Sequence, residues 1–360
     1  MKKKIFLSAL LLLAWCMFAT TFYKTICMML IVAVWHKTLR DKLPPSAKRW
    51  GMKAVWLCLV LVLWTAMPRY RIHSGDRVRL VYLKEDDTGF IAKHPPLAQY
   101  VLNTLLPEEE IVNVGIMAAR LKCLPFLSGR LSQELDHDIA AGKRGNFFSP
   151  FDNLGWENPM SGVYAQAFND VLGGHDRAAY IIAPKHYDKD KAYPLVVFCH
   201  GYLGNWQLYQ GIWKDLDNCI VLSICTRGLS GIFTQEDIGY IFSHYIPYLE
   251  QEGYRIDRDR RHLIGLSNGG SAIIATMNSQ YAKQFKSITT ISCNLEGLRR
   301  VPCRVNLIGG GRDASSNRMP AQCRQLKSMG VDARLFYDED ETHYVLVNRR
   351  KDIIEFLQND

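Results

Sequence analysis

Ser267 stands at the centre of the pentapeptide Gly265–Gly269, which reads GLSNG. This G-x-S-x-G pattern forms a nucleophile elbow where a strand precedes it and a helix follows it. Both conditions are predicted here, because the apolar run His262–Leu266 comes before the serine and the helix-like run Gly270–Gln284 comes after it. An elbow holds the serine hydroxyl above the edge of a sheet, and its glycines let strand and helix approach closely. Ser267 is therefore our candidate nucleophile, with an ordinary strand-to-helix turn as the alternative.

A serine hydroxyl becomes a good nucleophile when a base takes its proton, and histidine is the usual base. Only one histidine, His343, follows Ser267 in the chain. It lies between the last predicted strand and the final predicted helix, where a functional loop is expected. In chains that carry this elbow the order is serine, then acid, then histidine. We therefore predict that His343 is the base.

A carboxylate must orient the histidine, and it is expected in the loop after the preceding strand. The segment Asn306–Asp313 is a strand-like run that enters a glycine-rich loop and ends in an aspartate. Asp313 is therefore our candidate acid. Its rivals, Asp338 and Asp340, lie too near His343 in the sequence to occupy a separate loop, and they are predicted to be solvated charges.

Backbone N–H groups must stabilise the oxyanion that forms when a serine attacks a carbonyl group. One donor is expected at Asn268, immediately after the nucleophile, and another in the turn after an early strand. That turn contains Gly201, which lets the backbone face the site, so the N–H of Tyr202 or Leu203 is the predicted second donor. An ordinary glycine turn is the alternative. His200 is predicted to form structural hydrogen bonds and not to act as a second base.

The elements that position these residues alternate between strand and helix from about residue 170 onward. Apolar, β-branched strands separated by helices predict a mostly parallel sheet with helices on both faces. In such sheets the functional residues gather in loops beyond the carboxyl ends of the strands. Strands are predicted at Ala178–Ala183, Leu195–Cys199, Cys219–Cys225, His262–Leu266, Ser287–Ser292, Arg304–Ile308 and Ala333–Tyr337, and helices at Gln235–Gly253, Gly270–Gln284, Met319–Gly330 and Val347–Leu357.

Residues 170–360 resemble the α/β-hydrolase superfamily, because the glycine turn, the elbow, the acid and the histidine follow in that order over about 190 residues. Within it, Tyr193–Gly201 resembles the polyhydroxybutyrate depolymerase and feruloyl esterase-like branch, as does Ile256–Arg261 running into Gly265–Gly270. The resemblance implies an α/β-hydrolase fold and hydrolysis of a carboxylic ester through an acyl-enzyme, without a metal ion or a cofactor. The chain departs from that branch in its N-terminal quarter and in the connecting region that follows it.

Residues 1–67 are predicted to form a membrane anchor of two apolar helices with a basic linker, so that a lipid bilayer is a predicted partner. The run Ile5–Trp35 is apolar apart from Lys24 and a few hydroxyls. It exceeds the roughly 20 helical residues that span a bilayer core. The second run, Ala54–Met67, is short but strongly apolar. The alternatives are a signal peptide for the first run and a buried or interfacial helix for the second.

The net charge of +9 is unevenly distributed, because residues 1–84 carry +13 and residues 85–360 carry −4. The acidic balance of the larger part argues against a face that binds nucleic acid. The linker His36–Lys53 carries about as many Lys and Arg residues as the two outer ends of the apolar runs together. The positive-inside rule therefore leaves the orientation open. The ten cysteines show no pairing pattern, which is typical of thiols in a reducing compartment. We therefore expect an integral membrane protein, and the cysteines favour a cytoplasmic main domain.

Residues 68–169 are predicted to be a connecting region of short strand and helices, followed by the hydrolase domain at 170–360. The segment Arg77–Leu83 alternates like a short strand. The cluster Asp136–Asp138 is predicted to lie on a solvated helix face, and no ligand spacing typical of a metal site occurs in the chain. No chemistry is predicted for the connecting region.

These observations predict a membrane-anchored serine hydrolase that cleaves a small-molecule carboxylic ester. A serine peptidase would use the same three residues, and an acyltransferase would use the same acyl-enzyme with an acceptor other than water. A non-catalytic protein of the same fold that binds a ligand or partner is a further alternative. The complete set of Ser267, Asp313 and His343 argues against a purely binding role.

Overall fold

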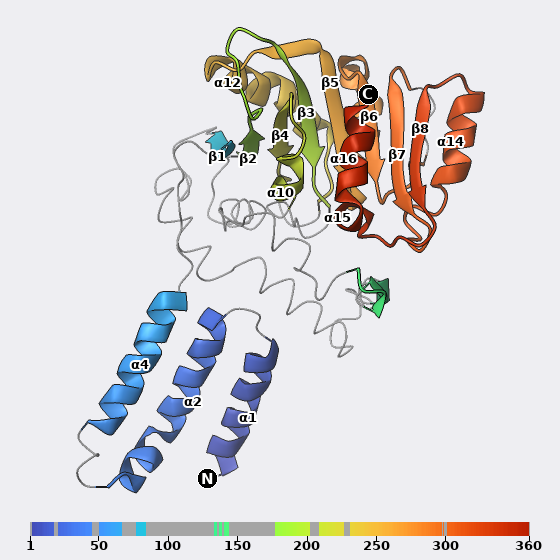
Figure 1. The fold of residues 1–360 in the computed structure, drawn as a ribbon. Coiled ribbons are helices and arrows are strands. Elements are labelled where there is room, and N and C mark those ends of the chain that lie inside the picture. The colour runs from blue at the N-terminus through green and yellow to red at the C-terminus, as the bar shows by residue number, and fades with distance from the viewer. Residues whose placement is uncertain are drawn as a thin grey trace. The chain divides into compact units, whose positions relative to one another are not determined.

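The structure is a computed structural model that describes residues 2–17, 21–44, 50–66, 77–83, 133–134, 137–138, 140–143, 177–201, 209–226, 231–296, 298 and 301–359. The chain divides into two compact units. One consists of Met1–Tyr70 with Asn103–Ser132, and the other of Arg71–Leu102 with Gln133–Asp360. The described part of the first unit is helical, whereas the second contains an eight-stranded sheet (Figure 1).

The described helices of the first unit are α1 (Lys2–Met17), α2 (Thr21–Lys42) and α4 (Gly51–Ala66). α1 and α4 both pack against α2. The indole Nε1 of Trp35 donates a hydrogen bond to Ser8 Oγ at 2.7 Å, which joins α2 to α1. The described helices thus form a small bundle around α2.

Among the described residues, the apolar run at 5–35 belongs to two helices, α1 and α2, where the sequence pattern led us to expect one. Thr20 and Thr21 interrupt the run with a residue type that favours helix starts over helix interiors. Lys24, the charge within the run, places its Nζ 5.2 Å from the centre of the Trp15 ring. The lysine therefore contacts protein through a cation–π interaction.

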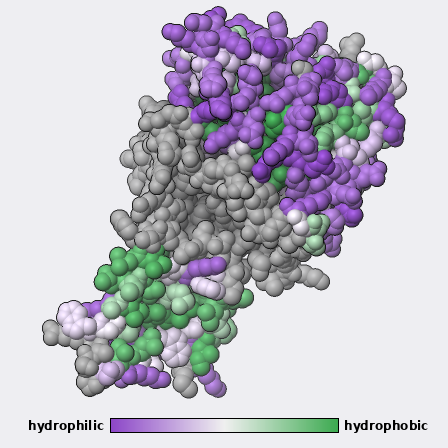
Figure 2. All heavy atoms as spheres, viewed as in Figure 1, coloured by the Kyte–Doolittle hydropathy of each residue, from purple (hydrophilic) through white to green (hydrophobic). Residues whose placement is uncertain are grey.

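Many hydrophobic side chains lie on the surface that these helices show in Figure 2, whereas the surface that the second unit shows in this view is largely hydrophilic. In the described ranges, every exposed large hydrophobic side chain except Ile232 and Met329 belongs to the first unit. No helix among the described residues is both long enough and apolar enough to cross a lipid bilayer.

The sheet of the second unit has the strand order β1-β2-β4-β3-β5-β6-β7-β8. β2 pairs antiparallel with β1 and with β4, and all other neighbouring strands are parallel. The predicted mostly parallel sheet is therefore confirmed, and the short strand predicted at 77–83 joins its edge. The strands are β1 (Val78–Leu83), β2 (Arg177–Ile182), β3 (Tyr193–Cys199), β4 (Ile220–Ile224), β5 (Ile256–Leu266), β6 (Ser287–Ile291), β7 (Arg304–Gly310) and β8 (Ala333–Asp338).

β5 is longer than predicted, because it begins at Ile256 and not at His262. Its first half contains charged residues that are largely exposed, whereas Leu263–Leu266 are buried. A register shift in the pairing with β3 separates the two halves. The apolar pattern of the sequence therefore predicted only the second half of β5, which is buried in the core.

Helices cover both faces of the sheet, as predicted. α10 and α16 lie in front of it in Figure 1, and α12 lies behind it. The α-helices are α10 (Gln210–Trp213), α11 (Gln235–Tyr240), α12 (Ile246–Gln251), α13 (Gly270–Met277), α14 (Met319–Ser328), α15 (Val345–Asn348) and α16 (Arg350–Gln358). A π-helical turn at Ile241–Tyr245 joins α11 to α12 just before Pro247, whose ring a regular helix would not accommodate.

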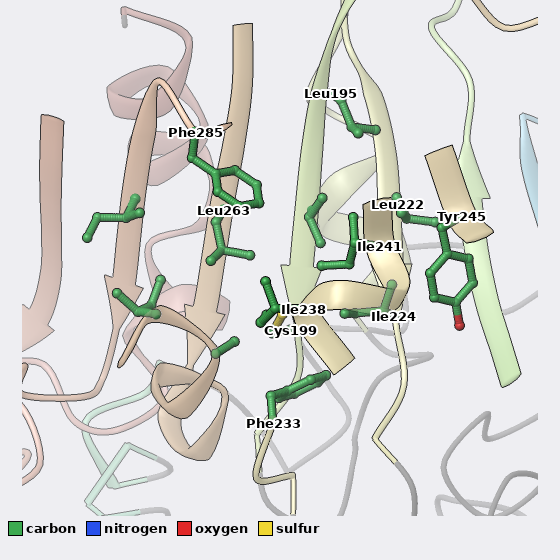
Figure 3. Packing of buried hydrophobic residues seen from close by; sticks show 14 of the residues in the cluster. Leu195, Cys199, Leu222, Ile224, Phe233, Ile238, Ile241, Tyr245, Leu263 and Phe285 are labelled. Carbon is green, nitrogen blue, oxygen red and sulfur yellow. The ribbon is translucent and has the colours of Figure 1, made fainter. Parts of the chain in front are cut away.

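The main core lies between the sheet and the helices α11 to α14. Alternate residues of the central strands point into it, including Leu195 and Leu222, and Ile238 and Ile241 belong to the same cluster (Figure 3). The opposite face carries Phe198, whose ring lies 4.8 Å from that of Trp213 in α10. Burial on both faces explains why the central strands are apolar without alternation, and it holds their carboxyl ends in fixed places.

Candidate active site

Ser267 lies at the sharp turn between β5 and α13. It has a positive φ of 52°, a conformation that costs a non-glycine residue about 1–3 kcal/mol. It also opens the short 3₁₀ turn Ser267–Gly269 that leads into the helix. The strained serine and the strand–turn–helix context are the features of a nucleophile elbow, as the sequence predicts.

Gly265 and Gly269 permit the close approaches on which this turn depends. A Cβ atom at Gly265 would overlap the carbonyl oxygen of Gly269, and one at Gly269 would overlap the carbonyl oxygen of Cys199 at the end of β3. A Cβ atom at Gly201 would lie 3.1 Å from Cβ of Ser267. The turn after β3 and the turn after β5 therefore meet directly at the serine.

His343 lies in the loop between β8 and α15 and contacts both other predicted residues. Its Nε2 is 3.0 Å from Ser267 Oγ, and its Nδ1 is 3.1 Å from Asp313 Oδ2. The imidazole is 16% exposed and the Asp313 side chain is fully buried. The structure thus joins three residues from the ends of three strands into one line of hydrogen bonds.

Asp313 is held as a carboxylate. Burial raises its pKa, but this effect is outweighed by hydrogen bonds from His343, from the Ser315 N–H and from the Ser316 hydroxyl, so that its pKa is lowered overall. The Ser315 N–H lies 2.8 Å from Oδ1, and Ser316 Oγ lies 3.0 Å from Oδ2. An ionised Asp313 accepts a hydrogen bond from the N–H at His343 Nδ1, which leaves Nε2 unprotonated and able to accept a hydrogen bond from Ser267.

The rival acids contact other groups. Asp338 pairs with Arg349, and Asp340 has an 81% exposed side chain that lies 3.3 Å from Arg312. The prediction that both are solvated loop charges holds for Asp340, whereas Asp338 is partly covered by its arginine. It is Asp313 that reaches the ring of His343.

The turn after β3 is anchored by His200, which is fully buried. Its Nδ1 donates to the Gly201 carbonyl at 2.7 Å, and its Nε2 accepts the Thr226 N–H at 3.2 Å. Burial lowers the pKa of His200 to about 4, so its imidazole is neutral at pH 7. The prediction of a structural hydrogen-bonding role is confirmed.

Of the predicted oxyanion donors, Asn268 follows Ser267 in the 3₁₀ turn, and its carbonyl accepts a hydrogen bond from Ser271 Oγ at 2.7 Å. Tyr202 and Leu203 lie outside the described residues. Among the residues that are described, no cluster of His, Cys, Asp or Glu is arranged to hold a metal ion.

Sequence reasoning missed a set of contacts from the connecting region. Glu134 Oε2 accepts the backbone N–H of His343 at 2.7 Å, and Asp138 Oδ2 accepts from Thr342 Oγ1 at 2.9 Å. Asp138 is fully buried, so the prediction that it lies on a solvated helix face is wrong. The local charge pattern gave no signal of a partner more than 200 residues away.

No protein-family model matches the chain, and no curated protein matches its sequence. Solved structures with a similar fold include a thermostable esterase at 19% identity, which covers 52% of this chain and 60% of the esterase with a TM-score of 0.40. The feruloyl esterase module from Clostridium thermocellum is 16% identical, with 51% and 82% covered and a TM-score of 0.41. The acylaminoacyl peptidase from Pyrococcus horikoshii is also 16% identical, with 51% and 39% covered and a TM-score of 0.38.

The chain therefore spans 60% of the length of that esterase and 39% of that peptidase. The fold itself rests on the strand order, on the helices that cover both faces and on the serine at the turn after β5. The second unit of this chain has the α/β-hydrolase fold.

Proposed function

We propose that the chain is a serine hydrolase in which Ser267 is the nucleophile, His343 the general base and Asp313 the acid that orients it. The observation that carries this proposal is the line of hydrogen bonds from Ser267 Oγ through both ring nitrogens of His343 to Asp313 Oδ2. Each residue lies in a loop at the carboxyl end of a strand, where parallel α/β sheets place their active sites.

The geometry supports a two-step reaction on a carboxylic ester. Ser267 Oγ attacks the carbonyl carbon while its proton passes to His343 Nε2, and Asp313 stabilises the imidazolium. Collapse of the tetrahedral intermediate breaks the bond to the alcohol, which takes the proton from Nε2, and leaves an acyl-serine. Water then attacks the acyl carbonyl carbon and gives a proton to Nε2. Collapse of this second tetrahedral intermediate breaks the bond to Ser267 Oγ, which takes the proton back from Nε2, and releases the carboxylic acid. The proposed oxyanion donors are the N–H of Asn268 and that of Tyr202 or Leu203.

A fluorophosphonate probe tests this proposal, because it reacts with an activated serine whatever the natural substrate is. The full chain in detergent is expected to be labelled, and Ser267→Ala is expected to lose the label. Turnover of a short-chain p-nitrophenyl ester, compared with the corresponding anilide, separates an esterase from a peptidase. Addition of an alcohol acceptor reveals acyl transfer. Absence of labelling in the unsubstituted chain would refute an activated serine.

We further propose that the helical unit attaches the chain to a lipid bilayer. Contiguous apolar surface of this kind is rare on proteins that face only water, and the exposed leucines, valines and aromatic residues of α1 and α4 supply it (Figure 2). The full chain is expected to sediment with membranes and to resist extraction by alkaline carbonate. Recovery of the intact chain in the supernatant would contradict the attachment.

We propose that the hydrolase unit faces the cytoplasm. The eight cysteines whose side chains the structure describes support this orientation, since all of them are thiols and none is part of a disulfide. Protease treatment of intact cells is expected to leave the hydrolase unit uncut, and treatment of inverted vesicles is expected to digest it. The reverse pattern would place it on the other side.

A further inference from the structure

We infer that Glu134 and Ser292 are positioning residues that hold the main chain of His343 from both sides. The inference rests on the proposed function, in which His343 is the base. Glu134 Oε2 accepts the N–H of His343 at 2.7 Å, and Ser292 Oγ donates to its carbonyl oxygen at 2.9 Å. Both polar groups of this one residue's backbone are therefore bound by side chains from elsewhere in the chain.

The two side chains come from distant segments and are themselves held tightly. Glu134 lies 209 residues before His343, and Ser292 follows the end of β6. Glu134 is 6% exposed and Ser292 is fully buried. In addition, Ser292 has a positive φ of 52°, a strained conformation that persists only where the surroundings impose it. Such strain at a residue that touches the proposed base favours a role in the site.

The segment that carries Glu134 is fastened to the same loop by further contacts. Asp138 Oδ2 accepts from Thr342 Oγ1 at 2.9 Å and from Asn348 Nδ2 at 2.8 Å. Lys143 Nζ lies 3.1 Å from Glu341 Oε1. Residues on both sides of His343 are therefore bound to the connecting region, which braces the loop as a whole.

The geometry predicts an effect on the reaction and not on the fold alone. His343 must keep Nε2 at hydrogen-bond distance from Ser267 while Nδ1 stays on Asp313. If Glu134 is removed, the N–H of His343 loses its acceptor, and the loop that carries the imidazole is no longer held in place at this point. A displacement of about 1 Å in a reacting group costs on the order of a hundredfold in rate.

Three substitutions and a control separate an effect on the reaction from an effect on the fold. Glu134→Ala removes the acceptor and the charge, whereas Glu134→Gln keeps one oxygen that accepts the N–H, loses the charge and carries an NH₂ group in place of the second oxygen. Ser292→Ala removes the donor to the carbonyl of His343. Thr289→Val is the matched control, because Thr289 lies on β6, the strand that Ser292 follows, is 1% exposed and loses a buried hydrogen bond with Asn306 that does not involve His343.

The rate of fluorophosphonate labelling and the kcat and KM of ester cleavage are measured on the full chain, with thermal unfolding of each variant. Glu134→Ala is expected to slow labelling and kcat by about a hundredfold with little change in KM. Glu134→Gln should restore the rates to within about tenfold of the unsubstituted chain, since the hydrogen bond remains. Ser292→Ala should slow both rates by at least tenfold, and Thr289→Val should leave them unchanged.

Normal rates in both Glu134→Ala and Ser292→Ala would overturn the inference while leaving the serine hydrolase intact. An equal loss in Glu134→Gln and Glu134→Ala would overturn the proposed hydrogen-bonding role. If Glu134→Ala does not fold, Ser292→Ala and Glu134→Gln carry the test, and a normal rate in Ser292→Ala would count against the inference. A chain that is not labelled at all would overturn both the inference and the proposed function.

Discussion

Asparagine in place of Asp313 keeps the shape of the side chain but reverses a hydrogen bond at His343. Oδ1 of Asp313 accepts the Ser315 N–H at 2.8 Å, and Oδ2 faces Nδ1 of His343 at 3.1 Å. An amide offers one acceptor oxygen and one NH₂ group. If the oxygen keeps the bond to the fixed backbone N–H of Ser315, the NH₂ group faces Nδ1. The imidazole must then accept at Nδ1 and carry its proton on Nε2, so it cannot take the proton of Ser267.

The expected loss is about 10⁴-fold in kcat, which is the effect of the wrong tautomer in a Ser-His-Asp triad. At 1.36 kcal/mol per factor of ten, the transition state loses about 5 kcal/mol. Asp313→Asn should also unfold at a lower temperature at pH 7. Because the folded pKa of Asp313 is lowered, the carboxylate stabilises the fold above about pH 4 and this contribution disappears as the pH falls further.

The assay is hydrolysis of a p-nitrophenyl ester, with thermal unfolding to show that the variant is folded. Asp338→Asn is the matched control, because Asp338 pairs with Arg349 and not with His343. It should retain activity within a few-fold. If Asp338→Asn were crippled and Asp313→Asn were active, the acid would lie in the loop after β8 and the reasoning from the Asp313 contacts would be refuted.

Three further predictions concern the turns around the serine. Burial lowers the pKa of His200 to about 4 in the folded chain, whereas it is about 6.5 in the unfolded chain. Between pH 6.5 and pH 4 the unfolded chain therefore binds one proton more than the folded chain, and the free energy of unfolding falls as the pH drops through this range. The free energy of unfolding should fall by up to about 3 kcal/mol over that range, and urea unfolding of His200→Asn should show a smaller pH dependence. Gly269→Ala should fold poorly, because its Cβ would overlap the backbone carbonyl of Cys199; recovery of a stable, active variant would contradict the packing of the turn. Ser267→Ala combined with His343→Ala should be little slower than either single variant, since the two act as one unit, whereas additive losses in ester turnover would show that they act separately.

The residues of the line from Ser267 to Asp313 could be predicted because each signal is local. The glycines of the G-x-S-x-G turn adjoin its serine, a single histidine follows it, and Asp313 lies in the glycine-rich loop after a strand-like run. The sheet could be predicted for a similar reason, since strands buried on both faces have a continuous apolar pattern.

The contacts of Glu134 could not be predicted in this way. A buried carboxylate and an exposed one have the same sequence pattern, and what distinguishes them is a partner brought close by the fold. The charged first half of β5 was missed because exposed strand residues lack an apolar signal. The break between α1 and α2 was missed because apolar composition dominates the run, and two threonines weigh little in such an average.

β1 has a consequence for any attempt to isolate the hydrolase unit. It pairs with β2 along the whole length of both strands, from Val78 opposite Ile182 to Leu83 opposite Arg177. A fragment that began at residue 170 would leave β2 as an open edge with unpaired N–H and C=O groups beside apolar side chains. Such an edge is a template for pairing with another chain, and hence for aggregation. The smallest fragment that keeps this edge protected must therefore include Val78–Leu83.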